Sequence, residues 1–303
     1  MKRRIVRTAG LSIAAMSLVA GATACSSGGS DDSGGSGGSG GSKASGDGAV
    51  RFDPIAALRS AEKSTDGADS AKVESTTSMG SLMSMTADGA LAWGDGLTGN
   101  LTVTYTGGTM ADTMRQLGTT SMQARYLPDA YYARMGDTFA EQSGGKHWIK
   151  YDYDDLETLG GGSGAYLKDQ MQNTTPNQSV KLLLASGDVH KVGEETVRGR
   201  QTTHYSGTVD VADLAEKNSN LSRSQLDELK KTLEQGGVTT ETVDIWVDDQ
   251  DLLVKKIEKG ETSSGAYNQT AYYSDYGTHV SVEEPPASDT ADFSELVQQQ
   301  SAG

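Results

Sequence analysis

Strand patterns in this chain come in runs, and helical patterns gather between those runs instead of alternating with single strands. This order predicts an α+β protein with an antiparallel sheet and argues against a series of βαβ units. We expect one sheet of roughly 9–11 strands, and open sheets of that size curl instead of staying flat. Helices must then cover its apolar face, because that face has to be removed from water. The sequence therefore predicts one large, curved antiparallel sheet with helices packed over its concave face.

The first part of the folded region predicts one helix followed by strands. Asp53-Pro54 is typical of a helix N-terminus, with an N-cap followed by proline at the first helical position, and we expect this helix to end near residue 63. Strands are expected over residues 72–79 and 82–93. Over residues 97–106 apolar or small side chains alternate with Thr and Asn, which predicts a strand with one buried and one polar face.

The remaining elements are hairpins that flank a central helical region. Pro128-Asp129 is a tight-turn signal and predicts a hairpin between the strands on either side. Ser222 and Gln225 form a capping box, and Gly236 ends the helix that they begin. The further expected strands are residues 121–127, 130–135, 147–153, 189–197, 201–211, 239–247, 252–259 and 269–276. The further expected helices are 110–117, 165–171, 180–184 and 222–236, with a mobile loop at 156–164 and a helical turn around Phe293 and Leu296.

The N-terminal segment has the organisation of a secretory signal peptide. Lys2-Arg3-Arg4 and Arg7 form a basic head, residues 9–24 are mostly apolar, and small residues lead into Cys25, the only cysteine. A cysteine at the cleavage site indicates a bacterial lipoprotein signal, in which Cys25 becomes the first residue of the mature chain. Its diacylglyceryl group supplies the two acyl chains that stable anchoring needs. We expect residues 1–24 to be the signal peptide and the mature protein to sit at the extracytoplasmic face of the cell membrane.

Two other interpretations of this segment stay open at the level of sequence. The apolar stretch is shorter than the roughly 20 residues of a spanning helix, but an uncleaved membrane helix is one alternative. A plain secreted protein with one free thiol is the other. Arg3-Arg4 also leaves open whether export follows the general or the twin-arginine route.

Composition separates a linker from a single acidic domain. Residues 25–49 are mainly Ser and Gly, which is typical of a flexible coil with a root-mean-square span of about 25–29 Å. Residues 50–303 contain no second linker, so we expect one domain there. The chain has 26 basic and 41 acidic residues and a formal net charge of −15, which argues against nucleic acid as a partner and favours a soluble surface.

No catalytic or metal-binding motif stands out. The chain has four histidines, and none has another His, Cys or Glu at metal-ligand spacing. His204 is expected to be a satisfied surface histidine on the face opposite Tyr205. The acidic residues at 152–157 and 248–251 lack the rhythm of a calcium loop. We expect no enzyme, no metal and no cofactor, and paired carboxylates of a wall-acting hydrolase are the one catalytic alternative left.

Several strand motifs resemble those of the LppX/LprG-type (LppX_LprAFG) lipoproteins of actinobacteria. They are Val192-Gly193-Glu194, residues 202–210, Trp148-Ile149-Lys150, residues 243–248 and Pro285-Pro286, and the likeness covers roughly residues 52–297. The resemblance implies a half-barrel, similar to periplasmic carriers of the LolA type, with an apolar cavity between sheet and helices. It also implies that the protein binds an acylated lipid or glycolipid and carries it across the cell envelope. Residues 107–118 and 156–164 look like insertions relative to that family.

The candidate cavity wall consists of apolar residues on three of the expected strands. Each methylene withdrawn from water contributes about 0.8 kcal/mol, so one long acyl chain provides on the order of 10 kcal/mol before ordering costs. The wall residues are expected to be Met83, Met85, Leu101, Val103, Tyr105, Val243, Ile245 and Val247, with residues 160–164 as the hinge of the entry route. The alternative is a plain sheet–helix core, in which case the chain is a non-enzymatic envelope sensor or protein-interaction module. The ligand, any envelope transporter partner and the oligomeric state stay open.

Overall fold

A computed structural model describes residues 53–156, 168, 171–172, 174–210 and 240–301 of the 303-residue chain. Cys25, the linker at 25–49, the hinge at 160–164 and the capped helix at 222–236 lie outside the described residues. The expected helix at 165–171 lies mostly outside them as well.

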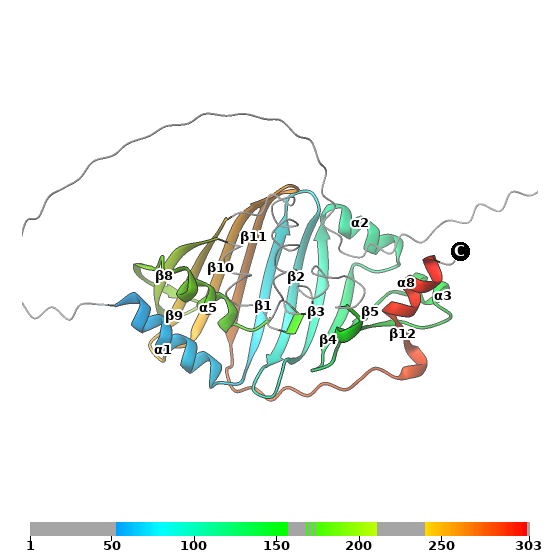
Figure 1. Cartoon of the computed structure of the whole chain (residues 1–303), viewed down its shortest axis with the longest axis horizontal. Coiled ribbons are helices and arrows are strands. Elements are labelled where there is room, and N and C mark those ends of the chain that lie inside the picture. Colours follow the sequence, from blue (N-terminus) through cyan, green and yellow to red (C-terminus); the bar gives the residue numbers. More distant parts are fainter. Residues whose placement is uncertain (1–52, 157–167, 169–170, 173, 211–239, 302–303) are drawn as a thin grey trace, which may run out of the picture.

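The described residues form one 12-stranded sheet that curves strongly from edge to edge (Figure 1). Its strand order is β12-β6-β5-β4-β3-β2-β1-β11-β10-β9-β8-β7, and all neighbours are antiparallel except β12 and β6. The strands are β1 Ser70–Met79, β2 Met83–Ala92, β3 Thr98–Gly107, β4 Ser121–Tyr126, β5 Ala130–Arg134, β6 Trp148–Asp152, β7 His190–Val197, β8 Arg200–Asp210, β9 Thr240–Asp248, β10 Leu253–Thr262, β11 Gly265–Ser274 and β12 Thr290–Asp292. The predicted fold class is confirmed, with β12 as a strand that the sequence did not indicate.

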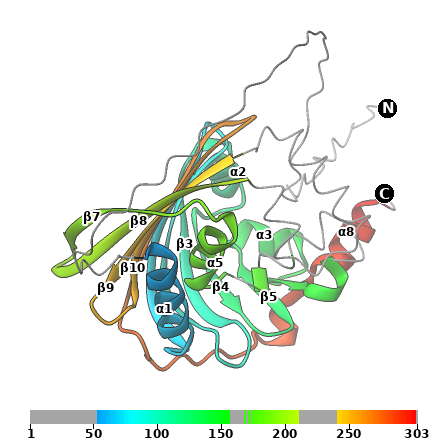
Figure 2. The same cartoon turned by 60° about the vertical axis from the view of Figure 1, so that its left-hand side comes forward.

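The described helices pack against one face of this sheet, which is the concave face (Figure 2). Those whose bounds are described at both ends are α1 Pro54–Asp66, α2 Gly108–Gln116, α3 Asp137–Gln142, α5 Asn177–Ser186 and α8 Phe293–Ser301, with a short 3-10 helix at Ala287–Asp289. Each contributes apolar side chains to the same core as the sheet, for example Leu58 from α1 and Leu183 from α5. The six-residue α3 was not predicted, whereas the short α2, α5 and the helical tail were.

A local signal places the start of α1 as predicted, and the helix continues to Asp66, beyond the expected end near residue 63. The Asp53 carboxylate accepts hydrogen bonds from the backbone N–H groups of Ile55 and Ala56, at 3.0 and 3.3 Å. Gly67 follows the last turn and donates its N–H to the Lys63 carbonyl. The buried face of α1 carries Leu58 and Ala61, so the helix is held by packing as well as by its cap.

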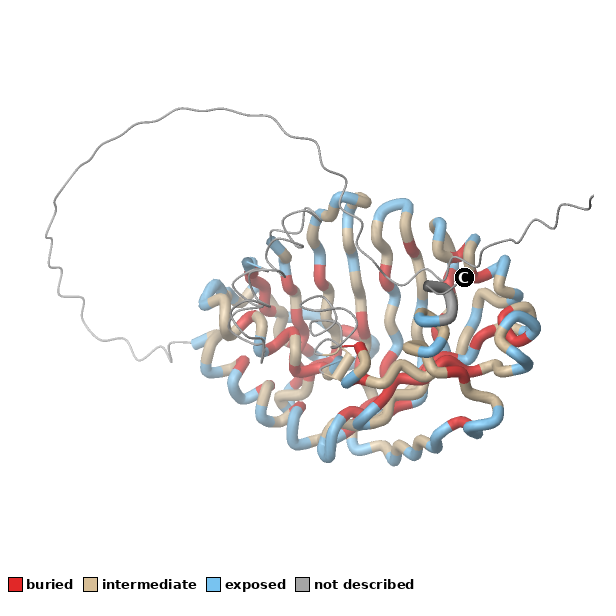
Figure 3. The backbone as a smooth tube through the Cα atoms, turned by 45° about the vertical axis from the view of Figure 1, so that its right-hand side comes forward, coloured by how far each residue is buried: buried red, intermediate tan, exposed pale blue. Residues whose placement is uncertain are grey.

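The alternation in the third strand also sets its two faces as predicted. Gly99, Leu101, Val103 and Tyr105 are buried, while the Asn and Thr side chains between them are exposed or half-buried. Figure 3 shows buried, half-buried and exposed positions along the strands of the sheet. The core therefore lies on the concave face, and the hydroxyl-rich face of β3 looks outward.

A segment that we call the strap, residues 277–286, connects β11 to the short helix before β12 along one end of the sheet (Figure 1). Hydrogen bonds to its backbone carbonyls come from Ser70 at 2.7 Å, Asn100 at 2.9 Å and Arg125 at 2.8 Å. Because these donors belong to β1, β3 and β4, the strap is fixed across the sheet and delivers β12 to the edge strand β6.

Candidate functional site

The eight predicted wall residues all belong to the core on the concave face. Seven are buried, and Met85 is half-buried against them. The strand order separates them into two groups, because β1, β11 and β10 lie between β2 and β9. Met83, Met85, Leu101, Val103 and Tyr105 form the first group on β2 and β3, and Val243, Ile245 and Val247 form the second on β9. The structure thus places these residues on one face without bringing all of them together.

The middle of the apolar face is partly accessible. Val103 of β3 lies opposite Ala87 of β2 and Met122 of β4. Ala87 and Met122 are both half-buried, and so is Met85, which lies two residues before Ala87 in β2. A band of apolar side chains across β2, β3 and β4 therefore retains contact with solvent.

A buried polar group, the ionic cluster, lies on the concave face under α5. It comprises Lys256 and Glu258 of β10, Ser179 of α5 and Glu241 of β9. The Lys256 ammonium donates to the Glu258 carboxylate at 2.9 Å and to the Ser179 hydroxyl at 3.0 Å, and the Ser179 hydroxyl donates to the same carboxylate. The side chains of Lys256 and Glu258 are only 12% and 9% exposed.

The charges in this cluster affect one another. Burial, together with repulsion from the Glu258 carboxylate, raises the pKa of Glu241 to about 8. Burial alone would lower the pKa of Lys256, but the facing Glu258 carboxylate raises it overall. At neutral pH the cluster therefore holds one ion pair and a second carboxyl that keeps its proton.

A second polar group, the tyrosine cluster, lies at the other end of the concave face and comprises Tyr105, Tyr126, Tyr131, Tyr151 and Tyr153. Tyr126 is opposite Tyr131, and Tyr131 is opposite Tyr151, so three rings form a row across β4, β5 and β6. Their centroids are 5.0 and 5.7 Å apart along the row. These separations are typical of favourable aromatic pairs.

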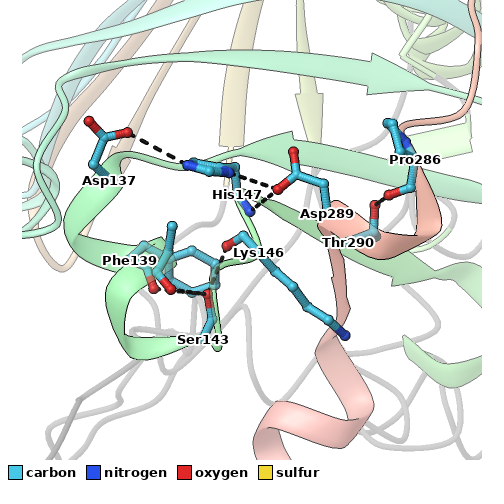
Figure 4. Close-up of polar contacts among 9 residues, drawn as sticks. Asp137, Phe139, Ser143, Lys146, His147, Pro286, Asp289 and Thr290 are labelled. Atoms are coloured by element: carbon cyan, nitrogen blue, oxygen red, sulfur yellow. Dashed lines mark hydrogen bonds and ion pairs between the residues drawn. The ribbon is translucent and has the colours of Figure 1, made fainter.

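The C-terminal helix completes this row. Phe293, the first residue of α8, packs on Tyr151 with ring centroids 4.7 Å apart. The chain just before it is held at β6 by His147, whose backbone N–H and ring Nδ1 lie 2.9 and 2.7 Å from the Asp289 carboxylate (Figure 4). The Nε2 atom on the other side of the ring lies 3.7 Å from Asp137. The hydrogen bonds from His147 hold the pKa of Asp289 below its usual value.

The convex face carries charged and aromatic side chains that form hydrogen bonds and ring contacts with one another. His204 stacks on Trp246 with ring centroids 4.1 Å apart, and its Nε2 lies 2.9 Å from the Asp244 carboxylate. The Lys255 ammonium lies 3.9 Å from the centroid of the Trp246 ring. Tyr205 is buried on the opposite face, so the predicted position of His204 is confirmed.

Neither a metal-binding group nor a membrane-spanning helix is present among the described residues. Among them, no group of three or more His, Cys, Asp or Glu side chains is placed to hold a metal ion. None of the described helices is both long and apolar enough to cross a bilayer.

Sequence reasoning missed the ionic cluster and the tyrosine cluster. The four residues of the ionic cluster come from three elements, and no local pattern links Ser179 to Glu258 or Glu241. The five tyrosines are visible in the sequence as an abundance of Tyr over Phe, 12 against 3. Only the strand register brings their side chains to one place.

Comparison with known proteins gives two extensive sequence matches. No family model matches the chain. The chain is 61% identical over 247 residues to a 31.2 kDa protein of Streptomyces griseus encoded between rplA and rplJ, covering 81% of each chain. It is 61% identical over 244 residues to the "Putative lipoprotein SCO4650" of Streptomyces coelicolor, covering 80% of this chain and 76% of that relative.

Solved structures with a similar arrangement share little sequence with the chain. The lipoprotein LppX of Mycobacterium tuberculosis matches with a TM-score of 0.47 and 17% identity, over 76% of this chain and 97% of that one. LprF of Mycobacterium bovis matches with a TM-score of 0.46 and 14% identity, over 77% of this chain and 96% of that one.

Proposed function

Because the chain belongs to the same family as these Streptomyces proteins, one of which is named a lipoprotein, we propose that it is an exported lipoprotein that binds a hydrophobic ligand. In this proposal Cys25 carries the lipid anchor at the extracytoplasmic face of the membrane. The folded domain holds an acylated lipid against the concave face of its sheet and carries it within the envelope.

One observation carries the ligand-binding part of the proposal. The apolar core covers the concave face from β6 to β8, and its middle band around Met85, Ala87 and Met122 is only half-buried. Partly exposed apolar side chains in the middle of a curved face favour occupation by an apolar molecule, because each buried methylene contributes about 0.8 kcal/mol. Methionine side chains also adapt their shape to what they contact.

The test compares two substitutions of adjacent residues that point to opposite faces of β2. Ala87→Phe adds a ring to the half-buried concave face, and Asp88→Phe adds the same ring to the exposed convex face. The full chain with Cys25→Ser, which removes its own anchor, serves as the parent for both. Molecules that co-purify with each form are identified by native mass spectrometry.

We expect lipid adducts on the parent and on Asp88→Phe, and at least tenfold fewer on Ala87→Phe. Absence of any lipid adduct from all three folded proteins would refute ligand binding and favour the sensor or interaction module. The anchor is tested separately with the unaltered chain. The unaltered chain, which has Cys25, should partition into membranes and incorporate labelled fatty acid. The Cys25→Ser variant should do neither.

A further inference from the structure

The hydroxyl groups of the tyrosine cluster have no protein partners among the described residues. The hydroxyl of Tyr153 is fully enclosed and makes no hydrogen bond, although this residue is only 2% exposed. None of the hydroxyls of Tyr105, Tyr126, Tyr131 and Tyr151 is hydrogen-bonded to any residue that the structure describes. Buried tyrosine hydroxyls normally have a partner, because an unsatisfied one keeps the full cost of its desolvation.

These hydroxyls lie in one place and remain protonated. Burial, with a smaller contribution from the nearby Tyr105, raises the pKa of Tyr126 and of Tyr151 to about 12. Burial also raises the pKa of Tyr131 well above its usual value, with smaller contributions from Tyr126, Tyr151, Tyr105 and Tyr153. The rings of Tyr126, Tyr131 and Tyr151 lie side by side on the concave face, and Tyr105 and Tyr153 also contribute to the raised pKa of Tyr131. Each of them is a neutral phenol that can donate a hydrogen bond.

The charges around the cluster exclude an anion as its partner. Arg125, Arg134 and Lys150 lie on the convex face, where the Arg125 guanidinium covers the ring of Trp148 at 4.6 Å and Lys150 pairs with Asp152. Lys168 already pairs with the carboxylate of Asp154, the residue after Tyr153, at 2.9 Å. Burial raises the pKa of Tyr153, and Tyr126 and the acidic Asp129 add to this effect. A carboxylate or phosphate placed there would be buried without a countercharge of its own, which is strongly unfavourable.

We infer that the tyrosine cluster binds the uncharged ester carbonyl oxygens of an acylated ligand. The inference rests on the proposed function. It adds the position of the polar part of the ligand, next to the tyrosine cluster. Ester carbonyls are hydrogen-bond acceptors without charge, so they match neutral donors in an apolar region. The ring faces of Tyr126, Tyr131 and Tyr151, with Phe293 beyond them, offer apolar contact to the chains attached to those esters.

The test uses the full chain with Cys25→Ser, so that its own acyl groups cannot occupy the cluster, after removal of co-purifying lipid. The probes are dioleoylglycerol, which has two ester carbonyls, and the glycerol diether with the same two chains, which has none. The variants are Tyr153→Phe and the triple variant Tyr126→Phe/Tyr131→Phe/Tyr153→Phe. Tyr132→Phe is the matched control, because Tyr132 is the buried neighbour of Tyr131 on the opposite face of β5.

We expect the parent and the control to bind the diester at least tenfold more tightly than the diether. Tyr153→Phe should weaken diester binding about fivefold, the usual effect of one lost hydrogen bond, and the triple variant should remove the preference for the diester. Diether binding should stay within twofold of the parent in every variant.

Folding is checked by urea unfolding of the lipid-free proteins. Tyr153→Phe should leave the free energy of unfolding unchanged or raise it, because the hydroxyl that it removes has no hydrogen-bond partner. A triple variant that keeps the parent's preference for the diester would overturn the inference and leave the proposed function standing. Failure of the parent to bind either probe would overturn both.

Discussion

The ionic cluster allows a quantitative test of how the concave face is held together. Replacing Lys256 by Met keeps most of the side-chain volume and removes the only cation among the four residues of the cluster. Glu258, with its side chain 9% exposed, then keeps only the hydrogen bond from the Ser179 hydroxyl. A buried carboxylate that loses its partner destabilises a protein by about 3–5 kcal/mol.

The assay is equilibrium unfolding in urea at pH 7 for the parent, Lys256→Met, Glu258→Leu and the double variant. The double variant removes both charges and should lie within about 1 kcal/mol of the parent, because buried ion pairs are often replaced by apolar residues at little cost. Lys255→Met, on the convex face of the same strand, is the control, with an expected loss of about 0.5–1 kcal/mol from its contact with Trp246.

The reasoning is refuted if Lys256→Met costs less than about 1 kcal/mol, or if the two single losses simply add in the double variant. Either result would mean that Glu258 reaches water in the folded state and that no buried pair exists.

Two further predictions concern the same sheet. The pKa of Glu241 is raised to about 8, so the folded state keeps a proton that the unfolded chain releases near pH 4.5. The free energy of unfolding should therefore fall as the pH rises from about 4.5 to 8. The slope should be at most about 1.36 kcal/mol per pH unit. Urea unfolding across this range should show a flatter profile for Glu241→Gln, and an unchanged profile would contradict the assignment. Gly207→Ala should destabilise by about 1–3 kcal/mol, because the added Cβ would lie 1.8 Å from the carbonyl oxygen of Asp188. Gly193→Ala, where nothing lies within 4 Å of the added atom, is the control and should stay within about 0.5 kcal/mol of the parent in the same assay.

Local sequence patterns specify the class of fold and most element positions. Period-two alternation set the buried face of β3, Asp53-Pro54 set the start of α1, and Pro128-Asp129 set the hairpin of β4 and β5. These features depend on residues that are neighbours in the chain, so the signal that specifies each one is local. The same holds for the buried face of β9, which carries Val243, Ile245 and Val247.

Strand pairing, and not local pattern, sets which side chains of β10 face inward. Continued alternation from Leu253 would place Lys255 and Ile257 on the concave face. The register with β9 shifts between Leu253 and Lys255, so Lys255 covers Trp246 on the convex face and Lys256 and Glu258 turn inward. A single extra residue in a strand reverses every later side chain, and sequence patterns do not mark where that residue is inserted.

The tyrosine cluster was likewise decided by the register of strands and not by any one of them. Tyr126, Tyr131 and Tyr151 come from three strands, and they meet because β4, β5 and β6 pair with these residues opposite one another. Local pattern fixes whether a side chain points inward, since that depends on the period of its own strand. Which inward-pointing side chains become neighbours depends on pairing between distant segments, and that pairing is selected by the packing of the whole sheet.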